Sequence, residues 1–148
     1  MITYKVPKYN IEIGSHPVAG TTNGGTTISD YDVVLNVSDD PPYGDDRNSF
    51  EKHKTTINWF PINEFGYWTY QVLYWAARLF DAAMDEKKNV YVHCHAGMHR
   101  SPLITYLYVR SLGHTVDETF ELFHDGLKIL GEKSNSNWLE ETLQNDIE

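Results

Sequence analysis

The feature that most constrains the fold of this chain is a buried strand that runs almost directly into a helix, in "VYVHCHAGMHRSPLITYLYV" (residues 90–109). The apolar run "VYVH" predicts a short strand buried on both faces, as in a parallel sheet. Ser101-Pro102 is typical of a helix start and Gly113 of a helix end, because proline is tolerated in the first turn and glycine after the last. The chain's only cysteine, Cys94, therefore begins a tight loop between a strand and a helix.

Further strands are predicted before this unit. Alternating apolar and polar residues indicate short strands in "ITYKV" and "NIEIGS". The apolar run in "YDVVLNVS", bounded by Asp32 and a turn-rich segment, indicates a stronger strand, and "TTINWFPI" is expected to be another that ends at Pro61. A helix is expected from Tyr67 to about Glu86, because apolar residues recur there at spacings of three and four. The predicted inward face consists of Trp68, Val72, Trp75, Leu79 and Ala82. We expect Trp68, Tyr74 and Trp75 to belong to the core rather than to a binding platform.

Two more helices are expected after Gly113. Thr115 to Glu118 has the pattern of a capping box. The inward stripe of that helix is predicted to be Val116, Phe120, Phe123, Leu127 and Leu130. A last helix is expected from about Ser136, with Leu139, Leu143 and Ile147 on one face. This order of elements predicts an α/β fold, a mainly parallel central sheet flanked by helices, in a single domain over residues 1–148.

Composition and charge exclude several classes of partner. The formal net charge of -9 disfavours a broad contact with nucleic acid or anionic membrane, both of which reward stripes of Lys and Arg. A single cysteine excludes an internal disulfide, and no segment has the length of a membrane span or the core of a signal peptide. We therefore expect a cytoplasmic monomer with no nucleic-acid or membrane partner.

The loop after the predicted strand has the properties of an anion site. Free backbone N–H groups and the dipole at a helix N-terminus attract negative charge, and Gly97 permits the sharp turn that such a loop requires. The same field, helped by Arg100, lowers the pKa of a thiol to roughly 3.5 to 7.5 in comparable settings. Cys94 is therefore predicted to be a thiolate that attacks phosphorus, with Arg100 binding the phosphoryl oxygens and Ser101 stabilising the sulfur as it leaves.

The stretch "HCHAGMHRS" resembles the H-C-x-x-G-x-x-R-S signature of cysteine-dependent protein phosphatases. The surrounding sequence, from about Ile11 to Leu143, is similar to the dual-specificity branch of that family. The resemblance implies hydrolysis of protein phosphotyrosine, phosphoserine and phosphothreonine through a cysteinyl-phosphate, with no metal or other cofactor. His93 is expected to support the loop from behind. The predicted phosphate-binding residues are His95, Ala96, Gly97, Met98, His99 and Arg100.

The sequence departs from the family at the general acid. Relatives use an Asp in the loop before the helix that precedes the signature, but the corresponding "FPINEFGYW" has none. Counting forward from Pro61 favours Glu64, whereas counting back from Cys94 favours Asn63, which has no titratable group. We expect Glu64 to be the acid, with Asp39 or Asp40 as the alternative. Without any acid, only substrates with good leaving groups would be hydrolysed.

Other interpretations of the same residues remain open. His93, Cys94, His95 and His99 could form a zinc site, although a loop that points N–H groups inward repels a cation and no Cys-x-x-Cys pair is present. Cys94 could also be an inert buried thiol. The missing Asp is compatible with a module that binds phosphorylated partners without turnover. Phosphoinositides, glucans and RNA 5′ phosphates are alternative substrates within the fold. The remaining histidines, His114 among them, are expected to be structural or at the surface.

Overall fold

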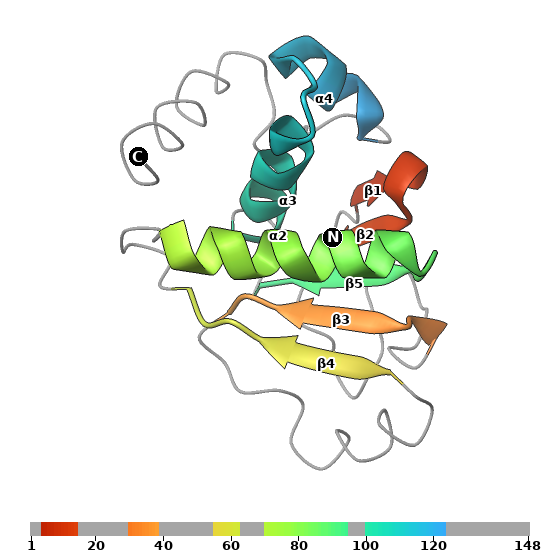
Figure 1. Cartoon of the computed structure of the whole chain (residues 1–148), viewed down its shortest axis with the longest axis vertical. Helices are drawn as coiled ribbons and strands as arrows, with labels where there is room; N and C mark the ends of the chain where they lie inside the picture. Colours follow the sequence, from red (N-terminus) through yellow and green to blue (C-terminus); the bar gives the residue numbers. More distant parts are fainter. Residues whose placement is uncertain (1–3, 15–29, 39–54, 63–69, 95–99, 124–148) are drawn as a thin grey trace.

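A five-stranded sheet forms the centre of the computed structural model, which describes residues 4–14, 30–38, 55–62, 70–94 and 100–123 (Figure 1). Its strands are β1 (Tyr4–Val6), β2 (Ile11–Gly14), β3 (Val33–Asn36), β4 (Thr56–Trp59) and β5 (Val90–His93). They lie in the order β1-β2-β5-β3-β4, and every neighbouring pair is parallel except β1 and β2. The prediction of a mainly parallel sheet is confirmed.

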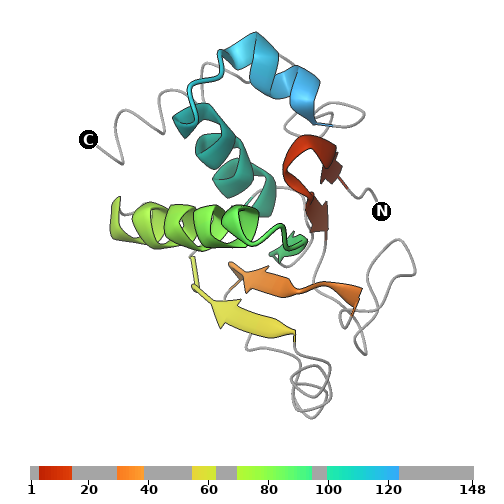
Figure 2. The same cartoon turned by 45° about the vertical axis from the view of Figure 1, so that its right-hand side comes forward.

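Three helices and one short 3-10 turn complete the described part of the chain. They are η1 (Pro7–Tyr9), α2 (Tyr70–Asp85), α3 (Arg100–Ser111) and α4 (Val116–Leu122). Helices α2 and α3 pack against each other over one face of the sheet (Figures 1 and 2), where the ring of Phe80 stacks on Tyr108 at 4.6 Å between centroids. Alternate strand residues such as Leu35 and Val92 face these helices, whereas Val34 and Tyr91 form a smaller cluster on the other face. None of the helices in these ranges is long and apolar enough to cross a membrane.

The local signals for helix ends are confirmed with one exception. Helix α3 begins at Arg100, Gly113 has a φ of 99°, and Thr115 and Glu118 exchange the two hydrogen bonds of a capping box. The prediction that α4 continues through Phe123 is wrong, because α4 ends at Leu122 and Phe123 is extended. Phe123 is nevertheless buried, since an extended residue can also turn its ring into the core. Leu127, Leu130 and the last predicted helix lie outside the described residues.

The predicted inward face of α2 is wrong at Trp75 and Ala82, whereas Leu79 does pack against the core. Ala76, Phe80 and Ala83 are buried, whereas Ala82 is exposed and Leu79 is only partly buried. Trp75 is 52% exposed and Tyr74 is 45% exposed, so neither belongs to the core. The helix carries apolar residues on adjoining faces, and the small alanines allow it to lie close to its neighbours while the bulky aromatic residues remain outside. Trp68 and the side chain of Val72 lie outside the part of the chain that the structure describes.

Gly14, the last residue of β2, has no side chain, and the Tyr91 hydroxyl occupies the space where one would begin. A Cβ at Gly14 would lie 2.3 Å from the Tyr91 Oη, and the buried Tyr91 ring packs against Tyr31 at 5.1 Å and His93 at 5.8 Å between centroids. Because those rings restrict its movement, we expect Gly14→Ala to destabilise the protein by about 1–3 kcal/mol, measured by urea denaturation. The cost should shrink in a Tyr91→Phe background, which lacks the clashing hydroxyl. An equal cost in both backgrounds would contradict this explanation.

Candidate active site

Cys94 lies directly after β5, at the carboxyl end of the three parallel strands β2, β5 and β3. Every residue of β5 is buried, as predicted, because β5 lies between β2 and β3 and beneath the helices. Cys94 itself is 2% exposed. The carboxyl ends of parallel strands are the usual place for a ligand site in an open α/β sheet. The fold thus brings the only thiol of the chain to the edge where a site is expected.

Ser101 faces Cys94 from the first turn of α3. The Ser101 Oγ lies 3.3 Å from the Cys94 Sγ, and both side chains are buried. The backbone carbonyl of Ser101 accepts a hydrogen bond of 2.9 Å from the Thr105 hydroxyl, which helps to hold this turn. The two ends of the predicted phosphate loop therefore meet. The loop residues between them, His95 to His99, lie outside the described residues.

Arg100 joins the start of α3 to the segment that follows β4. Its side chain is 5% exposed, and its Nη1 donates a 2.9 Å hydrogen bond to the carbonyl of Ile62. The Ile62 N–H in turn donates to the carbonyl of Val37, just after β3. Guanidinium groups bind carbonyl and phosphoryl oxygens in the same way, so a buried arginine here is suited to an anion. Ile62 is also the last described residue before Asn63 and Glu64, which lie outside the description together with Asp39 and Asp40.

His93 supports the backbone at Cys94. Its buried Nδ1 lies 3.2 Å from the Cys94 carbonyl oxygen, and its own carbonyl accepts the Val37 N–H at 2.9 Å. Tyr91, two residues earlier, is kept neutral because burial raises its pKa, and the nearby Glu12 and Cys94 raise it further. In the Nδ1 hydrogen bond, the His93 imidazole thus contacts the backbone of Cys94 rather than its thiol.

Asn36 is a buried polar residue at this edge that sequence reasoning missed. It lies next to His93 in the ladder between β3 and β5, and its Oδ1 accepts hydrogen bonds from the Ser38 N–H at 2.9 Å and the Ser38 hydroxyl at 2.6 Å. The Ser38 carbonyl accepts the indole N–H of Trp59, at the end of β4. An asparagine that ends an apolar strand is the signal that could have identified it, because a buried amide needs hydrogen-bond partners.

No group of three His, Cys, Asp or Glu side chains in the described ranges is close enough to hold a metal ion. Two of the four residues in the zinc interpretation, His95 and His99, lie outside those ranges. His114, predicted to be structural, joins two distant segments through a hydrogen bond of 2.6 Å between its Nε2 and the Tyr9 hydroxyl.

A comparison with models of protein families matches residues 15–142 to the catalytic domain of dual specificity phosphatases. The chain belongs to this family. A comparison with curated protein sequences gives no match to the chain. The signature residues Cys94, Arg100 and Ser101 all fall within the matched range.

Solved structures show the same fold at low sequence identity. The phosphatase superposes on Tk-PTP in its active form with a TM-score of 0.67 and 18% identity, covering 93% of this chain and 91% of that one. Human DUSP28 matches with a TM-score of 0.65 and 18% identity, over 96% and 98% of the two chains. PTPMT1 in complex with PI(5)P matches with a TM-score of 0.66 and 14% identity, over 96% and 95%. The fold class predicted from the sequence is therefore confirmed.

The chain thus has a cysteine-phosphatase fold in which a buried thiol and a buried hydroxyl lie 3.3 Å apart. A buried thiol beside a hydroxyl can act as a nucleophile and then as a leaving group, because the hydroxyl can donate a hydrogen bond to the sulfur when it is ionised. Arg100, the residue before Ser101, adds a buried positive charge at the start of the same helix.

Proposed function

We propose that this chain hydrolyses phosphate monoesters through a cysteinyl-phosphate intermediate. The observation that carries the proposal is the 3.3 Å approach of the Ser101 hydroxyl to the Cys94 sulfur at the junction of β5 and α3. The buried Arg100, at the start of the same helix, supports it by offering a fixed positive charge for a phosphoryl group.

The reaction has two steps. In the first, the Cys94 thiolate forms a bond to phosphorus while the bond from phosphorus to the ester oxygen breaks, and an acid protonates the departing oxygen. In the second, water attacks the cysteinyl-phosphate, its proton returns to that acid, and inorganic phosphate leaves. Ser101 stabilises the thiolate that is released, and Arg100 binds the phosphoryl oxygens throughout. The backbone of His95 to His99 is proposed to bind the same oxygens, and His93 to hold the loop.

Glu64 is the proposed acid, with Asn63 as a neighbouring support. The hydrogen bond between Arg100 and the Ile62 carbonyl supports this assignment, because only two peptide units separate Ile62 from Glu64. We expect Glu64→Gln to lower kcat by about 10²- to 10⁴-fold for alkyl phosphates. The effect on p-nitrophenyl phosphate should be much smaller, since nitrophenolate needs little protonation.

Steady-state kinetics with both substrate types test this assignment. Asn63→Ala removes the proposed support but retains the Glu64 carboxyl, so it should lower kcat less than Glu64→Gln does. Equal kcat values for wild type and Glu64→Gln on the alkyl phosphate would contradict the assignment. Asp39→Asn and Asp40→Asn would then be the next variants to measure.

The proposed substrates are phosphotyrosine, phosphoserine and phosphothreonine in proteins, as the family membership suggests. The test is the release of phosphate from phosphotyrosyl and phosphothreonyl peptides by the purified wild-type chain between pH 5 and 8. Release that depends on Cys94 is expected. The proposal fails if no phosphate is released from any monoester, and binding of the peptides without release would favour the phospho-binding module.

A phosphoinositide is the alternative substrate, and the likeness to the PTPMT1 complex with PI(5)P favours it. The same assay with PI(5)P in mixed micelles distinguishes the two classes through their kcat/KM values. The net charge of -9 argues for the peptide, because an anionic membrane surface repels an acidic protein. Glucan and RNA 5′ phosphates, the cytoplasmic location and the monomeric state stay predictions from the sequence.

A further inference from the structure

A recess of about 250 Å³ lies at the opposite end of β5 from Cys94. It is lined by Lys8, Tyr9 and Asn10 from η1 and its end, and by Met84 and Lys87 from the end of α2. The Val90 N–H donates a 2.9 Å hydrogen bond to the Asn10 carbonyl, which fixes the recess to the amino end of β5. The recess is therefore separate from the candidate active site.

Two lysines line this recess without an ion pair to any carboxylate in the described part of the chain, although the charge of Lys8 adds to the hydrogen bonds from Thr115 that lower the pKa of the nearby Glu118. The structure describes four lysines, of which Lys5 pairs with Glu12 at 3.7 Å and Lys88 pairs with Glu86 at 2.7 Å. The other two, Lys8 and Lys87, both line the recess and make no ion pair with a described residue. Two lysines without an ion pair at one recess are notable in a protein with a net charge of -9.

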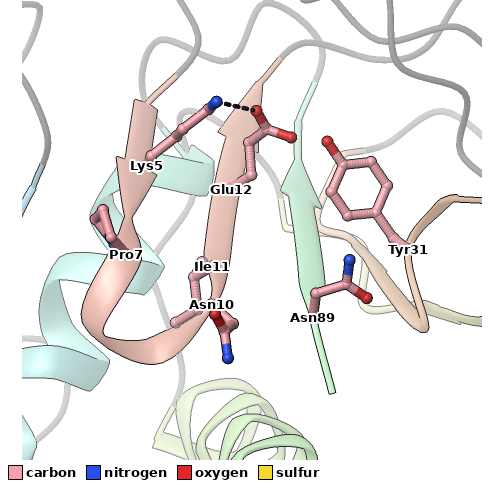
Figure 3. Close-up of a pocket in the computed structure, with 7 residues that line it drawn as sticks. All are labelled: Lys5, Pro7, Asn10, Ile11, Glu12, Tyr31 and Asn89. Atoms are coloured by element: carbon pink, nitrogen blue, oxygen red, sulfur yellow. Dashed lines mark ion pairs between the residues drawn. The ribbon is translucent and has the colours of Figure 1, made fainter. Parts of the chain in front are cut away.

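An adjoining pocket of about 230 Å³ provides a contrast (Figure 3). Lys5 and Glu12 point toward each other across it, so its lysine already has a counter-charge (Figure 3). Asn10 lines both spaces. Neither lysine of the recess, Lys8 or Lys87, makes such an ion pair with a described residue.

The backbone at the recess is held in an uncommon conformation. Asn10 and Lys87, with φ of 55° and 56°, are the non-glycine residues with positive φ among the described residues, and both line the recess. Lys87 follows α2 in a Schellman motif. The Lys87 N–H donates to the Met84 carbonyl, and the Lys88 N–H donates to the Ala83 carbonyl. Glycine is the favoured residue at that position because it has no Cβ. A lysine there is less stable than a glycine, which suggests that its side chain has a function.

The walls of the recess are fixed by contacts behind it. The Tyr9 hydroxyl is held by His114, and the Lys8 ammonium lies 5.7 Å from the centroid of the Tyr9 ring. The Tyr108 hydroxyl donates a 2.6 Å hydrogen bond to Asp81, and its oxygen lies 3.2 Å from the Met84 sulfur. The recess is thus formed before any ligand arrives, which lowers the entropic cost of binding.

We propose that this recess binds a dianionic phosphate group, as the free ion or on a small molecule. Two ammonium groups match two negative charges, and lysine binds phosphate as a compact point charge without the planar geometry that arginine imposes. The Asn10 amide supplies further hydrogen-bond donors. The site does not involve Cys94, so it is independent of the proposed phosphatase activity.

Methionine methyl NMR tests the site in the full chain, which contains Met1, Met84 and Met98. Met84 reports the recess and Met98 reports the signature loop, so binding at the two places is observed separately. The probes are inorganic phosphate and phenylphosphonate at pH 8.5, with sodium chloride at the same ionic strength as the control. We expect a saturable shift of the Met84 methyl with phosphate, and a shift with phenylphosphonate as well if the site takes a phosphate group on a small molecule. No shift at Met84, or the same shift with chloride, would overturn the proposal.

Lysine variants identify the groups responsible. Lys8→Ala, Lys87→Gly and Lys87→Gln should each weaken phosphate binding at Met84 by about tenfold or more, since each removes a charged hydrogen-bond donor. Lys88→Ala is the matched control, because Lys88 already forms an ion pair with Glu86. This variant should bind phosphate as the wild type does. Lys87→Gly should also raise Tm by about 2–5 °C, because glycine adopts positive φ without strain. Wild-type affinity in both Lys87 variants would refute the site, whatever happens at Met98.

Discussion

We expect Cys94→Ser to lower kcat for p-nitrophenyl phosphate by about 10⁴-fold or more, the size of effect typical of removing a catalytic nucleophile. Serine is nearly isosteric with cysteine, but its hydroxyl has a far higher pKa than a thiol and is not ionised at neutral pH. The rate therefore falls because the nucleophile is lost. Initial rates at saturating substrate, measured from pH 5 to 8, give the ratio directly.

Controls separate loss of chemistry from loss of fold. Cys94 packs in the main core cluster, and the exchange of sulfur for oxygen should leave Tm within a few degrees of the wild type. The variant should also still bind a phosphotyrosyl peptide, because Arg100 and the loop are unchanged. Residual activity within about tenfold of the wild type would mean that another group is the nucleophile. If the wild type binds the peptide without releasing phosphate, the chain is a binding module instead.

We expect Arg100→Lys to lower kcat/KM by about 10²- to 10³-fold, the loss typical of removing a fixed donor to the transition state. Lysine keeps the positive charge but has neither the planar fork nor the reach to bind phosphoryl oxygens at two points. The variant also loses the Nη1 hydrogen bond to the Ile62 carbonyl. An unpaired buried carbonyl costs about 1–3 kcal/mol, so urea denaturation should show a lower free energy of unfolding as well.

Arg78→Lys is the matched control for this substitution. Arg78 lies on the exposed side of α2, 5.5 Å from the Trp75 ring centroid and 5.7 Å from that of Tyr74. Its replacement should change kcat/KM by less than about twofold, because it lies on the solvent-exposed side of a helix. If Arg100→Lys and Arg78→Lys reduced kcat/KM equally, Arg100 would have no special role.

Local sequence signals predicted the elements near the site well. A buried strand, Cys94, and a helix that starts at Arg100 follow from apolar runs, proline and glycine, each of which acts over a few residues. The capping box at Thr115 is equally local. The signature then pointed to one reaction type, phosphate transfer to a thiolate, because a cysteine, a glycine and an arginine at this spacing are typical of a loop that binds phosphate.

The face of α2 was not predictable in the same way. Its sequence offers apolar residues on adjoining faces, and the periodic pattern alone favoured the one with Trp75. Phe80 is buried instead, because it stacks on Tyr108 of α3, which lies twenty-eight positions away in the sequence. Burial of one face depends on the shape of a distant partner, which the helix's own sequence does not contain.

The sequence by itself determined the strand, the loop and the helix that surround Cys94, because backbone propensities and helix ends depend on neighbours in the chain. Only the tertiary structure decided that Arg100 bonds to Ile62, that Asn36 lies beside His93, and that Lys8 and Lys87 line one recess. These contacts join residues far apart in the sequence. They arise from the order of strands in the sheet and from the packing of helices on it, which minimise exposed apolar surface across the whole chain at once.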